Sequence, residues 1–207
     1  MDENTLTRAE KQRRASRGEL YDWLQCIVSA LLICILVFVF AARGIGVLGT
    51  SMVPTLRGGE LADGAAIGGD RLLVSKLFYE PKQGDIVVLR KPSFKDEPIV
   101  KRVIAVGGQT IDIDFDAGIV YVDGEPLKED YVNEPTHRRI DFEGPVTVPE
   151  GYVFVMGDNR NASTDSRDSK ISVVDERYIL GKAYLLVMPG AEPTTGKRDF
   201  GRIGWLH

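Results

Sequence analysis

Residues 99–106 read Ile-Val-Lys-Arg-Val-Ile-Ala-Val, an apolar run interrupted by two adjacent charges. If the run is a β-strand, alternation places four side chains on one face: Ile99, Lys101, Val103 and Ala105. A lysine among apolar neighbours loses solvation, which lowers its pKa by up to about 3–5 units when burial is complete. The stretch therefore predicts a buried strand that carries an amine able to act as a general base.

Short strand-like segments lie on both sides of this run, separated by turn residues. They are 71–75, 85–90, 110–115, 119–122, 147–148, 152–156 and 179–188. Asp123-Gly124, directly after one of them, is the strongest short-range hairpin signal. Many short strands without alternating helices predict a mostly β fold, an antiparallel β-sheet or barrel-like domain. Residues 128–145 are polar and predict a surface excursion.

The other decisive segment is Trp23–Ala42, twenty residues without a charge. At about 1.5 Å per residue, a helix of this length spans the roughly 30 Å hydrocarbon core of a bilayer. A buried core helix and a cleaved secretory signal are the alternatives. A core helix is usually shorter and shows a polar stripe, and the run is too long for a signal sequence and lacks a clean cleavage site. The sequence therefore predicts a retained transmembrane helix.

Basic residues set the expected orientation of this helix. Arg8, Lys11, Arg13, Arg14 and Arg17 precede the span, whereas only Arg43 follows it closely. By the positive-inside rule, residues 1–22 are a cytoplasmic tail, 23–42 the transmembrane helix, and 43–207 an extracytoplasmic β-rich domain. We expect a single-pass protein of the plasma membrane, with the lipid bilayer as a partner and 43–50 as a short connector.

Composition excludes several function classes. The formal net charge is −4, so the basic stripe typical of nucleic-acid binding is not expected. The cysteines, Cys26 and Cys34, both fall within the apolar span, so no disulfide is expected in the outer domain. The chain has no HExxH motif and no Cys/His cluster, and we expect neither metal nor cofactor. Its two histidines, His137 and His207, lie in a polar loop and at the C-terminus, positions that do not suggest a catalytic base.

A nucleophile is available fifty residues before Lys101. Ser51 stands in Gly49-Thr50-Ser51-Met52-Val53-Pro54-Thr55-Leu56, a tight-turn context. A serine with an unprotonated lysine suffices for acyl transfer without histidine. Taken alone, Ser51 is as readily a turn serine, and Lys101 as readily an edge-strand lysine. A third segment, Gly157-Asp158-Asn159-Arg160 through Ser163-Thr164-Asp165-Ser166-Arg167, offers a hydroxyl and carboxylates directly after an apolar strand.

Together these segments resemble the bacterial type I signal peptidase family, membrane-anchored Ser/Lys endopeptidases. The similarity lies in residues 51–56, 84–88, 101–108, 157–160 and 163–167, and extends over most of 47–181. The resemblance implies that Ser51 attacks the scissile carbonyl, that Lys101 is the neutral general base, and that Ser163 hydrogen-bonds the lysine amine. It also implies structural ion pairs Asp165–Arg167 and Asp158–Arg102, and an oxyanion donor at the Ser51 N–H.

The resemblance further implies the substrate. Members of the family cut exported pre-proteins that carry signal peptides, after small residues at the first and third positions before the scissile bond. We expect the walls of shallow apolar pockets to come from Met52, Leu56, Ile99 and Val100. Gly49 stands where some members carry a serine that donates to the oxyanion, so a second donor is unassigned. Two alternatives stay open: a self-cleaving repressor-type Ser/Lys peptidase and a non-catalytic extracytoplasmic binding scaffold.

Overall fold

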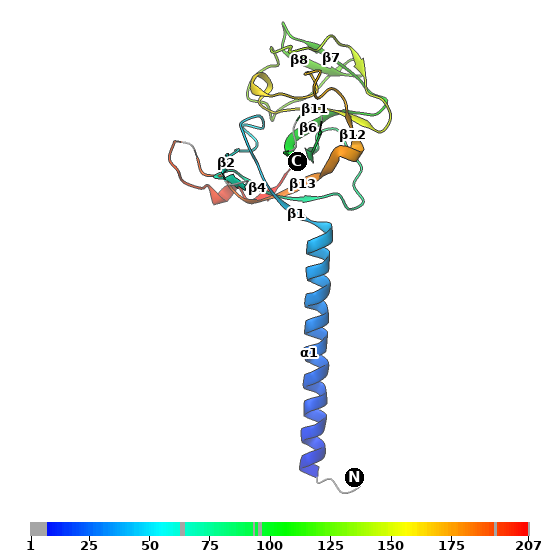
Figure 1. Cartoon of the computed structure of the whole chain (residues 1–207), viewed down its shortest axis with the longest axis vertical. Coiled ribbons are helices and arrows are strands. Elements are labelled where there is room, and N and C mark those ends of the chain that lie inside the picture. Colours follow the sequence, from blue (N-terminus) through cyan, green and yellow to red (C-terminus); the bar gives the residue numbers. More distant parts are fainter. Residues whose placement is uncertain (1–7, 63–64, 93, 95–96, 193, 207) are drawn as a thin grey trace. The chain divides into compact units, whose positions relative to one another are not determined.

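The computed structural model describes residues 8–62, 65–92, 94, 97–192 and 194–206, and the chain divides into two units, Met1–Ala41 and Ala42–His207. The described part of the first unit is the helix α1 (Arg8–Ala41), drawn in blue in Figure 1. It begins well before the predicted span because residues 8–22 are rich in Ala, Glu, Gln, Lys and Arg, which favour helix. By length and composition its window Glu19–Leu36 could cross a membrane, and none of that window is buried.

The second unit is built on an eight-stranded antiparallel sheet, which confirms the predicted β class. Along the sheet the order is β1-β4-β13-β5-β6-β11-β12, and β14 also pairs with β13. The bounds are β1 Arg43–Gly46, β4 Arg71–Ser75, β5 Ile86–Leu89, β6 Ile99–Val106, β11 Tyr152–Met156, β12 Val174–Asp175, β13 Ile179–Met188 and β14 Gly204–Trp205. Register shifts within β13 and between β6 and β11 bend the sheet, as bulges do.

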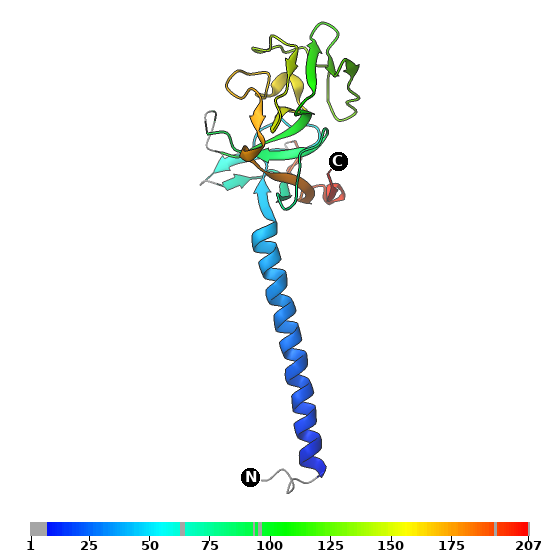
Figure 2. The ribbon, with the colours of Figure 1, turned by 90° about the vertical axis from the view of Figure 1, so that its right-hand side faces the viewer.

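Two smaller sheets complete this unit. A four-stranded sheet has the order β10-β7-β8-β9, and β2 pairs with β3. Their bounds are β2 Glu60–Ala62, β3 Ala65–Ile67, β7 Thr110–Asp114, β8 Ile119–Val122, β9 Glu125–Pro126 and β10 Val146–Thr147. Within the unit, Figure 1 places β7 and β8 at the opposite end from β4 and β13, with β6 and β11 between them. Figure 2, turned by 90°, shows the same separation of β7 and β8 from β4 and β13.

The central strands are buried on both faces. In β5, Ile86 and Val88 belong to one apolar cluster, whereas Val87 and Leu89 belong to another. A third cluster joins β6 and β11 to the four-stranded sheet. This double burial explains why these strands read as continuous apolar runs rather than as alternating ones.

The predicted alternation along 99–106 holds only in part. Ile99 and Val103 pack in the same cluster, as expected, but Ala105 packs with Ile104 in the cluster on the other side. The reason is a bulge, because Val155 of β11 pairs with Val103 while the preceding Phe154 pairs with Ala105. A sequence pattern of period two does not reveal such an extra residue.

Other expectations are confirmed or corrected locally. Asp123 and Gly124 connect β8 to β9 with φ values of 54° and 82°, the left-handed geometry that the hairpin signal predicts. Residues 43–50 are not only a connector, because 43–46 form the edge strand β1 beside β4. Residues 128–145 are not only a surface excursion, because Thr136 and Phe142 are buried. Phe142 stacks edge-on between Phe115 and Phe154 at centroid distances of 6.0 and 5.8 Å.

Glycines allow the chain to close a loop over residues 47–59. The Gly49 N–H donates to the Gly59 carbonyl at 3.2 Å, and the Gly59 N–H donates to the Val47 carbonyl at 2.9 Å. A Cβ at Gly58 would lie 1.7 Å from the Gly49 oxygen, and one at Gly59 would lie 2.0 Å from the Ile67 oxygen. The closing end of the loop, at residues 58 and 59, therefore requires residues without side chains.

We expect Gly59→Ala to lower the free energy of unfolding by about 1–3 kcal/mol or more, because backbone atoms must move to admit the methyl group. Urea unfolding followed by circular dichroism measures the change. Gly44→Ala is the matched control, because a Cβ there meets nothing within 4 Å. Equal stability of the two variants would contradict the close approach.

Candidate active site

Ser51 lies near the start of the closed loop at residues 47–59. We call its residues 49–59 the nucleophile loop. Met52 and Leu56 pack the loop against the large sheet, and their side chains are 1% and 0% exposed in the apolar core. Between them runs a single helical turn, in which the Leu56 N–H donates to the Met52 carbonyl at 2.8 Å. Ser51 itself is half-buried, so its hydroxyl is held at the edge of the core.

Lys101 is brought to this serine by strand β6. Its side chain is 3% exposed, and its Nζ donates a hydrogen bond to Ser51 Oγ at 2.6 Å. The pairing of β6 with β5 sets Lys101 opposite Val87, in the middle of the large sheet. The amine of Lys101 thus lies beside the Ser51 hydroxyl and away from bulk water, although the strand around it is apolar.

Ser163 lies in the same neighbourhood but is not bonded as the resemblance implies. Its Oγ is buried and has no hydrogen-bond partner within the part of the chain that the structure describes. A Cβ at Gly157 would lie 2.3 Å from Ser163 Oγ and 2.4 Å from the Ser51 carbonyl oxygen. Gly157 thus lets the loop 157–167 approach the nucleophile loop closely. The orienting role of Ser163 stays a prediction.

The loop 157–167 is held in shape by a buried ion pair, Asp165–Arg167. Both side chains are 0% exposed, with Arg167 Nε to Asp165 Oδ1 and Nη2 to Oδ2 each at 2.8 Å. Burial by itself would raise the pKa of the Asp165 carboxyl, but Arg167 and the Gly157 N–H outweigh that effect and keep this pKa below its ordinary value. The carboxylate therefore stays charged and bonded at neutral pH.

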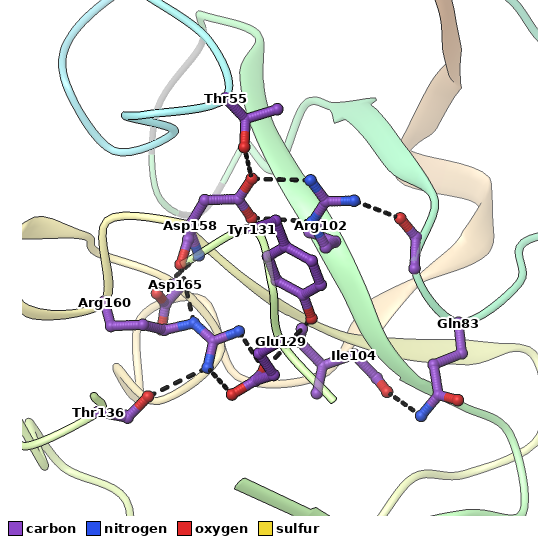
Figure 3. A network of polar contacts seen from close by, with 12 residues as sticks. Thr55, Gln83, Arg102, Ile104, Glu129, Tyr131, Thr136, Asp158, Arg160 and Asp165 are labelled. Carbon is purple, nitrogen blue, oxygen red and sulfur yellow. Dashed lines mark hydrogen bonds and ion pairs between the residues drawn. The ribbon is translucent and has the colours of Figure 1, made fainter. Parts of the chain in front are cut away.

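A second buried ion pair, Asp158–Arg102, joins this loop to the neighbour of Lys101. Arg102 donates from Nε to Asp158 Oδ1 at 2.9 Å and from Nη2 to Oδ2 at 2.8 Å. Asp158 Oδ2 also accepts from the Thr55 hydroxyl at 2.6 Å. Figure 3 shows this carboxylate between the two donors. One side chain thereby links the strand of the candidate base, the loop 157–167 and the nucleophile loop.

The network extends to residues that were not predicted from the sequence as part of the site. Arg160 Nη1 donates to Glu129 Oε2 at 2.8 Å and to Thr136 Oγ1 at 3.0 Å, as Figure 3 shows. The Tyr131 ring lies 3.9 Å from the Arg102 guanidinium and 5.9 Å from that of Arg160, both within cation–π range. Burial raises the pKa of the Tyr131 hydroxyl, so it stays neutral. Only Arg160 carried a signal, because it stands in the motif at 157–160.

Asn159 was also missed as a contact of the nucleophile loop. Its backbone N–H donates to the Ser51 carbonyl at 3.0 Å, and its Nδ2 donates to the Thr50 carbonyl at 3.1 Å. The loop 157–167 therefore supports the peptide groups on both sides of the candidate nucleophile. The motif could have suggested Asn159, but only its position in space shows what it binds.

A cleft of about 250 Å³ opens beside the Ser51–Lys101 pair. Its lining includes Ile99 and Val100, two of the four predicted pocket residues. Met52 and Leu56 lie instead in the core cluster, and their contribution to a substrate pocket stays a prediction. Among the described residues, no group of three or more His, Cys, Asp or Glu side chains is placed to hold a metal. The fold and the site together define a class, a β-rich hydrolase with a serine hydroxyl bonded to a buried amine.

Comparison with known proteins gives the family. The family model described as signal peptidase, peptidase S26, matches residues 20–188. The signal peptidase I of Mycobacterium tuberculosis (strain ATCC 25618 / H37Rv) is 33% identical over 237 residues, covering 90% of this chain and 79% of that protein. The probable signal peptidase I-1 of Synechocystis sp. is 36% identical over 175 residues, covering 80% and 81% respectively. The chain belongs to the signal peptidase family, peptidase S26, and is a serine endopeptidase.

Other relatives agree in name. The signal peptidase I of Bacillus licheniformis is 33% identical over 191 residues, covering 87% of this chain and 95% of that protein. A crystal structure of a signal peptidase I from Enterococcus faecalis V583 is similar with 30% identity and a TM-score of 0.43, covering 50% of this chain and 97% of that one.

We expect Asp158→Ala to destabilise the protein by about 3–5 kcal/mol, because it leaves the Arg102 charge buried without its carboxylate. Urea unfolding of the purified variant measures the loss. The control is Asp130→Ala, which breaks the exposed Lys128–Asp130 pair, whose side chains are 84% and 78% exposed. That variant should unfold with the wild type, since exposed pairs contribute little. Two variants of equal stability would contradict the role assigned to Asp158.

Proposed function

We propose that this protein removes signal peptides from exported pre-proteins with Ser51 as nucleophile and Lys101 as general base. The observation that carries the proposal is the 2.6 Å hydrogen bond between Lys101 Nζ and Ser51 Oγ, with Lys101 only 3% exposed. Membership of the signal peptidase family supports the substrate class. A non-catalytic binding scaffold, the alternative function, would not require an amine buried against a serine hydroxyl.

The chemistry follows from burial. An amine removed from water favours its neutral form, which accepts a proton. Lys101 takes the Ser51 proton as Oγ attacks the scissile carbonyl, and the resulting ammonium protonates the leaving amine. Water then attacks the acyl-enzyme ester, with Lys101 again as base, and releases the carboxyl product. In this proposal the Ser51 N–H stabilises the oxyanion. The Gly49 N–H is already bonded to the Gly59 carbonyl and is not a second donor.

The substrate binds as an extended strand in this proposal. The β11 pairing with β6 ends at the pair Met156–Arg102, so β11 does not extend beside Ile99 and Val100. A peptide that adds there places alternate side chains toward the cleft beside Ile99 and Val100. In this proposal, the part of the cleft beside Ile99 and Val100 accepts small side chains at the first and third positions before the scissile bond and excludes large ones.

The membrane arrangement completes the proposal. The family supports a membrane-anchored protein, and α1 contains the helix window apolar enough to span a bilayer. The excess of Lys and Arg before that window favours a cytoplasmic N-terminus and an extracytoplasmic β-rich unit in the plasma membrane. Anchoring keeps the site at the membrane from which signal peptides emerge, which lowers the entropic cost of positioning the substrate.

We expect Ser51→Ala and Lys101→Ala each to reduce cleavage at least about 10³-fold, because each removes one reacting group. Detergent-solubilised protein is assayed on a peptide with a small-x-small cleavage site, and circular dichroism verifies folding. Lys128→Ala is the matched control, since its side chain is 84% exposed and pairs with Asp130 at the surface. Substantial cleavage by either folded site variant removes the assignment.

We expect kcat/KM to rise with pH through an apparent pKa below the roughly 10.4 of free lysine and then to level off. The sign follows from the role of Lys101, because only the neutral amine accepts the serine proton and deprotonation is favoured as pH rises. Burial shifts that transition to lower pH. Initial rates on the same peptide between acid and alkaline pH measure the profile. A flat profile would show that no buried amine limits the rate.

A further inference from the structure

The C-terminal segment reaches the nucleophile loop. Residues after 188 lie outside the matched family model, yet they form the short helix η4 (Phe200–Arg202) and strand β14 (Gly204–Trp205). The Arg202 guanidinium donates from Nη1 to Asp70 Oδ1 at 3.0 Å and from Nη2 to Asp70 Oδ2 at 2.8 Å. Nη2 also donates to the Thr55 carbonyl at 3.1 Å. One arginine thus bonds the buried Asp70 and a peptide group of the loop that carries Ser51.

Asp70 ties this contact to the closing end of the nucleophile loop. Its side chain is 0% exposed and accepts from the Arg57 N–H at 2.8 Å and from the Gly190 N–H at 2.6 Å. Its own N–H donates to the Arg57 carbonyl, and its carbonyl accepts from the Val47 N–H, each at 2.8 Å. The Asp70–Arg202 pair therefore holds the loop at residue 55, within the turn that starts at Ser51, and at residue 57, after that turn.

Thr55 is held from two sides by opposite charges. Its hydroxyl donates to Asp158, which holds Arg102 next to Lys101, and its carbonyl accepts from Arg202. Between Ser51 and Thr55 lies one turn, closed by the Leu56 N–H on the Met52 carbonyl. Displacement of Thr55 would carry Ser51 with it, and the distance from Ser51 Oγ to Lys101 Nζ would change.

We infer that Arg202 is a positioning residue for the cleavage reaction: it fixes Thr55, and through it the Ser51 hydroxyl, against the buried amine. The inference rests on the proposed function. Misplacement of a reacting group by about 1 Å can cost about 100-fold in rate, which makes such a distant contact measurable.

Loss of Arg202 should lower the stability of the protein without unfolding it. Asp70 keeps its two backbone N–H donors without Arg202, so its carboxylate is not left bare. The hydrogen bonds described above for Asp70 and Arg202 do not involve the cleft residues Ile99 and Val100, so peptide binding should persist. The Thr55 carbonyl, by contrast, loses its guanidinium donor. The expected signature is a lower kcat with little change in KM.

The test compares Arg202→Gln with Arg198→Ala in detergent-solubilised full-length protein. Arg198 is the matched control, because its Nη1 donates to the Pro189 carbonyl at 2.5 Å within the same C-terminal segment. We expect Arg202→Gln to lower kcat about 10- to 100-fold on a small-x-small peptide, with KM within about twofold. Arg198→Ala should keep both constants within about twofold of the wild type.

Two further variants distinguish a positioning role of Arg202 from a general loss of folding. Arg202→Lys retains the charge beside Asp70 and should recover part of the lost kcat. Arg202→Ala leaves a site that water can reach, since the arginine side chain is 19% exposed, so millimolar guanidinium ion should raise its kcat several-fold. Guanidinium should not raise the kcat of Arg198→Ala.

The outcomes separate this inference from the proposed function. Wild-type protein that cleaves no such peptide would overturn the proposed function, and this inference with it. Active wild type with unchanged kcat in folded Arg202→Gln would overturn the inference alone. Equal losses in Arg202→Gln and Arg198→Ala, without rescue by guanidinium, would also overturn it, because they would indicate general loosening of the C-terminal segment.

Discussion

The buried carboxylate of Asp158 is the constraint on which the rest of the site depends. It is 0% exposed, and it binds Arg102 on the central strand and Thr55 in the nucleophile loop. Asp158 itself stands at the start of the loop 157–167. Three segments remote in sequence are thus fixed relative to one another by one side chain, and the Ser51–Lys101 distance follows from that arrangement.

A buried ion pair such as Asp158–Arg102 is unfavourable in free energy unless its surroundings bond it fully, but it then fixes the geometry of its neighbours. Removing two charges from water carries a large desolvation penalty, which is offset only when geometry is good and every remaining donor and acceptor is bonded. Both buried pairs meet that condition. Arg102 adds a bond to the Gly84 carbonyl, and Arg167 bonds the carbonyls of Arg138 and Arg160. Apolar side chains could fill the same volume, but they would not set the direction of the neighbouring lysine.

Much of the fold was predictable because its strands are short, apolar and punctuated by turns. The segments 71–75, 119–122, 152–156 and 179–188 have the expected bounds, and the hairpin at Asp123-Gly124 has the expected geometry. The strands β1, β2, β3, β9, β12 and β14 were missed. They lie outside the central run of the sheet, and the formation of β1, β12 and β14 depends on partners far along the chain rather than on local pattern. The bulge in β6 was missed for the same reason.

The candidate site was likewise predictable from the sequence only in part. Residue types in short motifs were enough to single out Ser51, Lys101, Asp158 and Asp165 with their arginine partners. The contacts of Asn159, Tyr131, Glu129 and Arg202 were not predictable, because a single polar residue in a loop carries no periodic signal. The expected bond from Ser163 to the lysine amine is absent from the structure, since motif spacing does not set the direction of a hydroxyl.

The amino-acid sequence by itself determined the apolar helix, the β-rich class and the chemical types available for catalysis. These properties follow from local hydrophobicity, turn residues and the identity of side chains. Only the tertiary structure decided that an amine 50 residues from a serine lies 2.6 Å from its hydroxyl. It also decided which carboxylates are buried and which residues of the C-terminal segment reach the site. The physical reason is that distances across a sheet depend on strand order, bulges and buried ion pairs, all of which join residues remote in sequence.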